Sequence, residues 1–287
     1  MKRVGEVGTW VIFGLVVIAA LSTFLPWHDP QLPGSVQLTV LEGGGRTRTQ
    51  RAVKPLCEYL SQQLRRSVVP KVVTASQMPE ELSKARLFLL PVSLLADSTG
   101  FEILARAKGP GLDAAYERPY LVFPQGKRWF ELKKPRLILG DSWSWMGGKG
   151  ASKYLAEHGH PLDSGFSEVA SGHDVYDHEE ALCALAHGSY DLAIVRESDL
   201  RRAIEDGIID PKRFSFGPAG PPGGGIVLAA APSLSPAARR SLRSAALNLD
   251  AFRFDNKHMP AALALSGLAL LGIDGFAPDR PFPNLRP

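Results

Sequence analysis

The chain has 287 residues, of which 45% are hydrophobic and 22% are charged. This composition excludes a largely disordered chain and is typical of a globular protein with one large domain or two small ones. The net charge of +4 comes from 33 basic and 29 acidic side chains. Because the excess is small and spread out, it gives no support to a nucleic-acid-binding protein, and we expect no such partner.

The N-terminal segment carries the strongest single signal. Lys2 and Arg3 precede an uncharged run over residues 7–27 that is rich in Val, Ile, Leu and Ala. As a helix with ~1.5 Å per residue, this run spans ~30 Å, the thickness of a bilayer core. Trp10 and Trp27 lie near its two ends, where aromatic side chains favour the membrane interface. The run therefore predicts export across a membrane, with the basic end remaining in the cytoplasm.

Two interpretations of this run stay open. A retained signal anchor gives a cytoplasmic N-terminus over residues 1–8, a transmembrane helix over 9–27 and a linker over 28–35. A cleaved signal peptide, with residues 20–22 as a loose cleavage site, is the alternative. The length and the terminal tryptophans favour the anchor. We expect a single-pass protein of the bacterial cytoplasmic membrane, with most of the chain in the periplasm or outside the cell.

The exported part alternates patterns of strands and helices. Strands are expected over residues 36–41, 68–73, 85–91, 120–123, 136–140, 166–170, 191–195 and 226–231. Helices are expected over residues 51–64, 78–84, 147–158, 178–187, 199–206, 235–248 and 259–271. This alternation predicts the α/β class with parallel strands.

Two polar connections, over residues 125–134 and 214–225, divide this pattern. The chain is expected to leave a first unit at the former and to return to it at the latter. This predicts a first lobe over residues 36–124 and 226–287 and a second lobe over 125–225. Such a double connection forms a hinge with a cleft between the lobes.

Ligands of parallel α/β sheets bind where strands end and helices begin. Two loops of this kind contain small and hydroxyl residues. The loop over residues 42–47 offers Gly44 and Thr47, and the loop over 140–148 offers other candidates. These are Ser142, Ser144, Trp145 and Gly147. Hydroxyls and the free N–H groups of a helix start suit an oxyanion.

A third loop, over residues 171–180, contains His173 and His178 among several acidic residues. A metal site is one interpretation, but it needs ligands from elsewhere in the fold. A capping box from Asp177 to Glu180 explains the acidic residues equally well. We predict neither a metal nor another cofactor. No catalytic motif is recognisable, which disfavours an enzyme.

The two cysteines, Cys57 and Cys183, lie far apart within helical patterns. Export permits a disulfide, but two free thiols are the favoured interpretation.

The stretch over residues 135–202 resembles the second lobe of the phosphonate-binding-protein-like family of ABC-transporter solute receptors. The resemblance lies in "LILGDSWSWMGGKGASKYLAEHG" and "ASGHDVYDHEEALCALAHGSYDLAIV", where that family has a Gly-Asp strand end, a Ser/Thr-rich loop and a Ser-Gly-x-His-Asp segment. In the first lobe, "VKPLCEYLSQQLRRSVVP" is similar to a family helix. The resemblance covers residues 36–277.

This resemblance implies a two-lobed type 2 periplasmic-binding-protein fold that closes on a small solute, often an organophosphorus oxyanion. Ser144 matches one hydroxyl of the family's Ser-Thr-Ser anion loop, whereas Trp145 and Met146 replace the other two. His173 and His178 both match the ligand-contacting histidine. The position of the family's first-lobe aromatic residue is occupied by Ser93 and its neighbour Leu94, so Ser93 is a ligand candidate.

Three functions remain in competition. The favoured one is a receptor that binds a small anionic solute and delivers it to an ABC permease. A sensor or scaffold with a degenerate pocket, acting through protein–protein contacts, is the second. A metal-dependent enzyme is the third.

Overall fold

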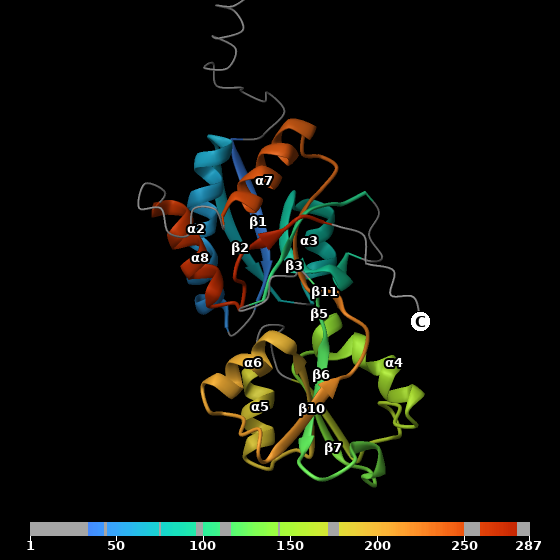
Figure 1. The fold of residues 1–287 in the computed structure, drawn as a ribbon. Helices are drawn as coiled ribbons and strands as arrows, with labels where there is room; N and C mark the ends of the chain where they lie inside the picture. Colours follow the sequence, from blue (N-terminus) through green and yellow to red (C-terminus); the bar gives the residue numbers. More distant parts are fainter. Residues whose placement is uncertain are drawn as a thin grey trace, which may run out of the picture.

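The computed structural model describes residues 34–42, 45–74, 76–95, 100–109, 116–142, 144–171, 178–249 and 259–279. The described strands form a six-stranded sheet, a five-stranded sheet and a two-stranded ladder. Figure 1 shows the two large sheets one beyond the other along the length of the molecule, each with its own helices. We call these two parts the six-strand lobe and the five-strand lobe.

The six-strand lobe has the strand order β13-β4-β12-β3-β1-β2. Its strands are β1 (Ser35–Leu41), β2 (Ser67–Val73), β3 (Leu87–Pro91), β4 (Glu102–Ala107), β12 (Ile226–Ala230) and β13 (Phe276–Ala277). Its helices are α2 (Arg46–Leu64), α3 (Met78–Lys84), the 3-10 turn η1 (Val92–Leu94), α7 (Pro236–Asn248) and α8 (Met259–Ala269). The strand β1 is parallel to β2 and β3, whereas β12 is antiparallel to β3 and β4.

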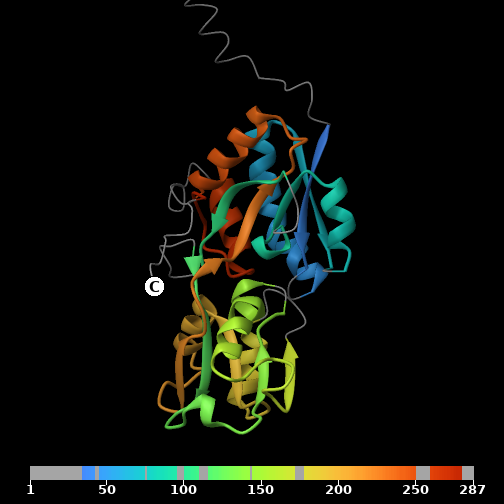
Figure 2. The same ribbon diagram turned by 90° about the vertical axis from the view of Figure 1, so that its right-hand side faces the viewer.

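The strand β1 shows why helices cover both faces of this sheet. Successive side chains of a strand point to opposite faces. Val36, Leu38 and Val40 are fully buried in one hydrophobic cluster with residues of α2, α7 and α8. Gln37 and Thr39 point to the other face, where α3 lies. Figure 2 shows α3 on one side of the sheet and the other three helices on the opposite side.

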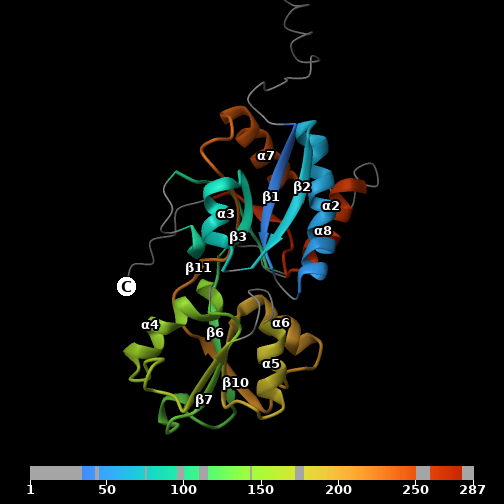
Figure 3. The same ribbon diagram turned by 180° about the vertical axis from the view of Figure 1, so that it is seen from behind.

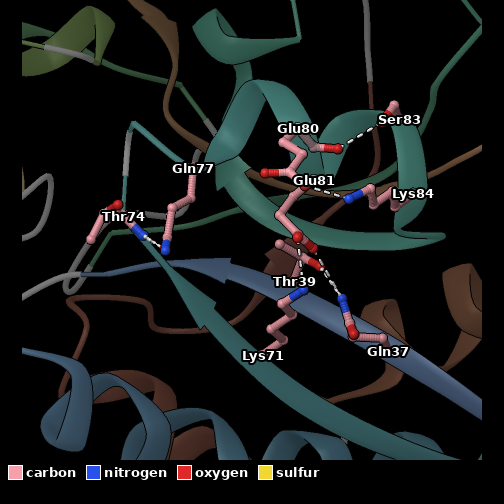
Figure 4. A network of polar contacts seen from close by, with 9 residues as sticks. All are labelled: Gln37, Thr39, Lys71, Thr74, Gln77, Glu80, Glu81, Ser83 and Lys84. Atoms are coloured by element: carbon pink, nitrogen blue, oxygen red, sulfur yellow. Dashed lines mark hydrogen bonds and ion pairs between the residues drawn. The ribbon is translucent and has the colours of Figure 1, made fainter.

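A polar network joins α3 to the sheet (Figure 4). The carboxylate of Glu81 accepts hydrogen bonds from Lys71 Nζ at 2.7 Å and from Gln37 Nε2 at 3.3 Å. Gln37 Nε2 also donates to the hydroxyl of buried Thr39 at 3.1 Å. A buried carboxylate is costly unless it is hydrogen-bonded and paired. These contacts therefore fix how α3 sits over β1 and β2.

The five-strand lobe has the strand order β10-β6-β9-β7-β8. Its strands are β6 (Pro119–Pro124), β7 (Arg136–Leu139), β8 (Glu168–Ser171), β9 (Leu192–Arg196) and β10 (Phe214–Pro218). Its helices are the 3-10 turn η2 (Trp129–Glu131), the π-helix η3 (Trp145–Lys149), α4 (Gly150–Glu157), α5 (His178–Ala186) and α6 (Glu197–Glu205). The strand β7 is parallel to β8 and β9, whereas β6 is antiparallel to β9 and β10.

Alternation along β7 again builds two cores. Ile138 packs with α5 and α6, whereas Leu137 and Leu139 pack with α4 on the opposite face. Figure 3 shows α5 and α6 on one side of this sheet and α4 on the other. After Arg136, the three remaining residues of the strand are all apolar because both faces are buried there.

The chain passes between the lobes at β5 (Tyr116–Glu117) and β11 (Gly223–Gly224), which pair with each other in an antiparallel ladder. The second passage lies within the predicted connection over residues 214–225. The first does not lie at residues 125–134, because β6 precedes them and already belongs to the five-stranded sheet. Local patterns cannot reveal which distant strand will pair with β6. The outer limits of the two predicted lobes stay a prediction.

Other expectations about the elements need correction. The sheets are mixed rather than parallel, since β4, β6, β10, β12 and β13 pair antiparallel with their neighbours. The sequence patterns missed β4, and β10 was placed in a polar connection. The predicted transmembrane helix over residues 9–27 lies outside the described residues. Among the described residues, no helix combines the length and the apolar character needed to cross a membrane.

The polar network predicts a specific stability effect. Glu81→Ala should lower the free energy of unfolding by about 1–3 kcal/mol, because Lys71 and half-buried Gln37 both lose the carboxylate that accepts their hydrogen bonds. Glu80→Ala on the same helix is the matched control, since its ion pair with Lys84 lies on the surface. Urea denaturation measures both. Equal unfolding midpoints for the two variants would show that the network does not fix α3.

Candidate functional site

The candidate site lies where β7 and β9 end, side by side, in the five-stranded sheet. These strands are parallel neighbours, so the loop after β7 and the residue that ends β9, Arg196, share one edge. The helix η3 begins after this loop and continues into α4, while α5 begins at His178. The site therefore has the position expected for ligands of parallel α/β sheets.

The buried carboxylate of Asp141 is the centre of the site. Ser144 Oγ donates to Asp141 Oδ2 at 2.7 Å, and the backbone N–H of Ser144 donates to Asp141 Oδ1. His178 Nε2 lies 3.2 Å from Asp141 Oδ2. The side chains of Asp141 and His178 are 0% and 1% exposed. Hydrogen bonds to both carboxylate oxygens offset the cost of burying this charge.

The orientation of His178 is fixed from two sides. The backbone N–H of Arg196 donates to His178 Nδ1 at 3.2 Å, so that nitrogen is an acceptor and the ring proton lies on Nε2, facing Asp141. Gly140 leaves room for the ring, because a Cβ at this position would lie 2.0 Å from His178 Nδ1. With both nitrogens engaged, His178 holds the loop in place.

The start of η3 presents free backbone donors. Ser144 is the N-cap, and its hydroxyl accepts the N–H of Gly147 at 2.9 Å. Among the described residues, no hydrogen-bond partner is found for the N–H groups of Trp145 and Met146. Because η3 runs into α4, these groups lie at the positive end of a longer helical segment. The arrangement suits a small anion.

Trp145 connects this loop to the passage between the lobes. Its indole Nε1 donates to the carbonyl of Pro221 at 3.1 Å, just before β11. Added Cβ atoms at Gly150 and Gly223 would lie 2.5 Å from the Trp145 carbonyl and 1.9 Å from the indole Cδ1, respectively. The two glycines therefore leave the space that Trp145 occupies, and the loop and β11 are packed as one unit.

A second contact links the two lobes. Arg196 and Asp199 form a buried bidentate ion pair, with Nε–Oδ2 and Nη2–Oδ1 distances of 2.7 and 3.0 Å. Gly272, in the turn after α8 of the other lobe, lies against it, since an added Cβ would be 2.1 Å from Arg196 Nη2. Burial raises the pKa of Asp199, but the charge of Arg196 outweighs this, and the pKa lies below its ordinary value.

The predicted site residues are only partly brought together. Ser144, Gly147 and His178 surround Asp141, and Trp145 lies beside them. Ser142 is exposed on the same loop.

In the six-strand lobe, Thr47 is exposed at the start of α2 and Ser93 is half-buried in η1. Gly44 and His173 lie outside the described residues. The roles of all these residues remain predictions.

The sequence analysis missed Asp141 and Arg196 as site residues. A signal for Asp141 was present, because an acidic residue that directly follows a buried strand and precedes a Ser N-cap can accept the hydrogen bonds of that turn. Arg196 left no comparable signal, since its role depends on the pairing of β9 with β7.

The described residues do not form the metal site that the sequence left as an alternative. They contain no group of three or more His, Cys, Asp or Glu side chains that could hold a metal ion, although residues 172–177 lie outside this statement. Both cysteines are thiols outside any disulfide, as predicted; Cys57 is buried, whereas Cys183 is only half-buried. Burial, with the nearby carboxylate of Glu58, raises the pKa of Cys57 to about 12.

The ion pair of Asp199 predicts a pH dependence. A carboxyl with a lowered native pKa stabilises the fold above its unfolded pKa of ~3.9, and this contribution is lost as the pH falls through the native pKa. Asp199→Asn should lower the free energy of unfolding by about 3 kcal/mol at neutral pH, because it leaves the charge of Arg196 buried without its carboxylate partner. The difference from the unchanged protein should shrink below about pH 4.

Chemical denaturation across this pH range measures the effect. Glu197→Gln, which removes the carboxylate partner of exposed Arg201, is the control and should lower the free energy of unfolding by at most about 1 kcal/mol. A penalty for Asp199→Asn that is the same at every pH would contradict the ionic contribution.

The packing of Trp145 predicts a coupling with Gly223. Gly223→Ala should lower the free energy of unfolding by about 1–3 kcal/mol, because the indole of Trp145 must move to make room for the new methyl group. Gly225→Ala should be mild, since an added Cβ there meets nothing within 4 Å. In a Trp145→Ala background, Gly223→Ala should cost little. Thermal unfolding of the four variants tests this, and equal penalties at positions 223 and 225 would refute it.

Comparison with known proteins agrees with this geometry. The family described as "ABC transporter, phosphonate, periplasmic substrate-binding protein" matches residues 40–278. No curated protein sequence matches the chain significantly.

Several solved structures share the fold. XAC2383 from Xanthomonas citri bound to ATP has a TM-score of 0.65 at 15% identity, covering 87% of this chain and 92% of that chain. PhnD1 from Prochlorococcus marinus in complex with methylphosphonate has a TM-score of 0.65 at 13% identity, covering 86% and 93%. A phosphonate-transporter binding protein from Pseudomonas aeruginosa, PA3383, has a TM-score of 0.63 at 16% identity, covering 85% and 81%.

These identities are low, so the structural likeness supports the two-sheet periplasmic-binding fold alone. The family match extends over most of the chain and covers both lobes. The chain therefore belongs to the family of periplasmic substrate-binding proteins of phosphonate ABC transporters.

Proposed function

We propose that this chain is an extracytoplasmic receptor for a small oxyanion of the phosphonate or phosphate class. It binds the anion between its lobes and delivers it to an ABC permease. A signal anchor over residues 9–27 keeps it at the cytoplasmic membrane, with the rest of the chain in the periplasm. The relative that is bound to methylphosphonate supports the ligand class.

The single observation that carries this proposal is the start of η3. Two backbone N–H groups, of Trp145 and Met146, have no partner among the described residues and lie at the start of a capped turn whose geometry Asp141 fixes. Preorganised donors of this kind bind an anion without further ordering cost. Ser142 is exposed on the same loop, and in this proposal it adds a hydroxyl donor.

Ser144 takes a positioning role in this proposal. Its hydroxyl proton is donated to Asp141, and one of its lone pairs accepts from Gly147. The hydroxyl therefore holds the loop and is not free to donate to a ligand. Ser144→Ala should weaken ligand binding through the loss of the N-cap, whereas Ser142→Ala should remove a direct donor.

Ligand binding is tested by thermal unfolding and calorimetry of the full chain with methylphosphonate, phosphite, phosphate and sulfate. A ligand at 100 times its Kd should add ~2.7 kcal/mol of stability. Ser142→Ala should weaken the binding of that ligand by roughly 12- to 160-fold, which corresponds to the loss of one hydrogen bond to a charged group. Ser164→Ala, on the surface of the same lobe, is the control.

A second function is favoured by one specific observation. Where the related loops carry hydroxyl residues, this chain has Trp145, which is docked on the passage between the lobes, and Met146, which is 1% exposed. A loop with fewer donors suits a membrane-anchored sensor or scaffold that acts through protein contacts. If none of the tested oxyanions gave a saturable response, the receptor proposal would be contradicted and this alternative favoured.

A further inference from the structure

The helix α8 is mostly apolar, with Ser266 as its one polar side chain. No charged side chain occurs from Met259 to Ile273. One face of the helix packs on α2, where Gly267 allows close contact, since an added Cβ would lie 2.3 Å from the carbonyl oxygen of Ala52. The buried residues of this face are Ala261, Ala264, Leu265, Gly267 and Leu268.

The opposite face of α8 exposes three large apolar side chains, with the small polar Ser266 between the second and the third. Met259, Leu263 and Leu270 are 57%, 50% and 53% exposed. Their spacings of four and seven residues place them on one side of the helix. An ordinary surface helix carries charged or polar residues on this side, and a helix that is apolar all round is buried. Among the described residues, this stripe therefore stays exposed although most of its side chains are of the kind that a partner normally covers.

One basic side chain contacts the end of this stripe, and two more follow it along α2. Arg48 Nη2 donates to the carbonyl of Leu270 at 3.3 Å, which places a guanidinium at the end of the apolar face. Arg51 and Lys54 follow on α2 at intervals of three residues and are exposed. Among the described residues, neither forms an ion pair, and Glu58 is the one acidic residue of α2. The surface thus combines apolar side chains with positive charge.

This combination fits an anionic lipid surface. Apolar side chains enter the boundary between head groups and acyl chains, and each nearby Lys or Arg adds ~1 kcal/mol of attraction to anionic lipid. A second copy of the chain would account for the apolar stripe but gives no reason for the basic side chains beside it. Apolar and basic residues together therefore point to a membrane rather than to a dimer.

The short segment between the proposed anchor and β1 favours the same partner, the membrane. The strand β1 begins at Ser35, and residues 28–34 span at most ~24 Å when fully extended. An anchor over residues 9–27 therefore keeps the six-strand lobe beside the bilayer. We propose that the surface formed by Met259, Leu263, Leu270, Arg48, Arg51 and Lys54 docks on the anionic membrane surface. This proposal rests on the anchoring stated under the proposed function.

The test places an environment-sensitive fluorophore on the stripe of the full chain. Leu263→Cys is labelled in a Cys183→Ser background, where Cys57 stays buried and unreactive because its pKa is about 12. The protein is reconstituted in phosphatidylcholine vesicles with or without phosphatidylglycerol. Docking predicts a blue-shifted emission that is strongest with phosphatidylglycerol.

Two controls sharpen this test. A probe at Val169→Cys, an exposed apolar position on β8 of the other lobe, should stay in water. Substituting both Arg48 and Arg51 by Gln should lower the docking equilibrium constant by roughly 30-fold in phosphatidylglycerol vesicles.

Vesicle flotation separates the failure of docking from the failure of anchoring. If the chain floats with the vesicles while the probe at position 263 stays in water, docking is overturned and the anchor stands. If the chain does not float, the anchoring is overturned, and docking is then tested by adding phosphatidylglycerol vesicles to that chain. An absent shift overturns docking as well. A blue shift without vesicles that grows with protein concentration shows a second copy on this surface and overturns the proposal.

Discussion

The site depends on one buried charge, the carboxylate of Asp141 where β7 ends. A carboxylate without solvent is tolerated only when its oxygens accept hydrogen bonds. Ser144 and His178 meet this requirement, and their positions in turn fix the start of η3 and the approach of α5. Gly140 and Gly147 are small for the same reason, because Cβ atoms there would lie 2.0 Å from His178 Nδ1 and 2.4 Å from Asp141 Oδ2.

The same loop is linked to two contacts where the lobes meet. Through Trp145 it packs on the segment before β11, and through the neighbouring end of β9 it reaches the ion pair of Arg196, which lies against Gly272 of the other lobe. Packed contacts of this kind have discrete arrangements rather than continuous ones. A displacement of this loop would therefore change these contacts, and with them the angle between the lobes.

Much of the fold follows from local patterns. The apolar runs at β1, β3, β7, β9 and β12 and the helical periodicity of α2, α3, α7 and α8 were recognisable because burial on both faces or on one stripe leaves a local trace. The strand β4 was missed, since its residues 102–107 include Glu102 and Arg106 within a short apolar run. The sequence also identified the family, through the residues that follow β7 and precede β9.

The sequence by itself determined the α/β class, two units, an apolar N-terminal run and the loop over residues 140–148 as a candidate site. The tertiary structure alone decided that β6 joins the five-stranded sheet, that His178 turns its ring toward Asp141, and that α8 exposes an apolar face. These three facts depend on contacts between residues far apart in the chain. Periodicity and spacing describe only neighbours, so they carry no information on which distant group completes a strand, a buried charge or a helix face.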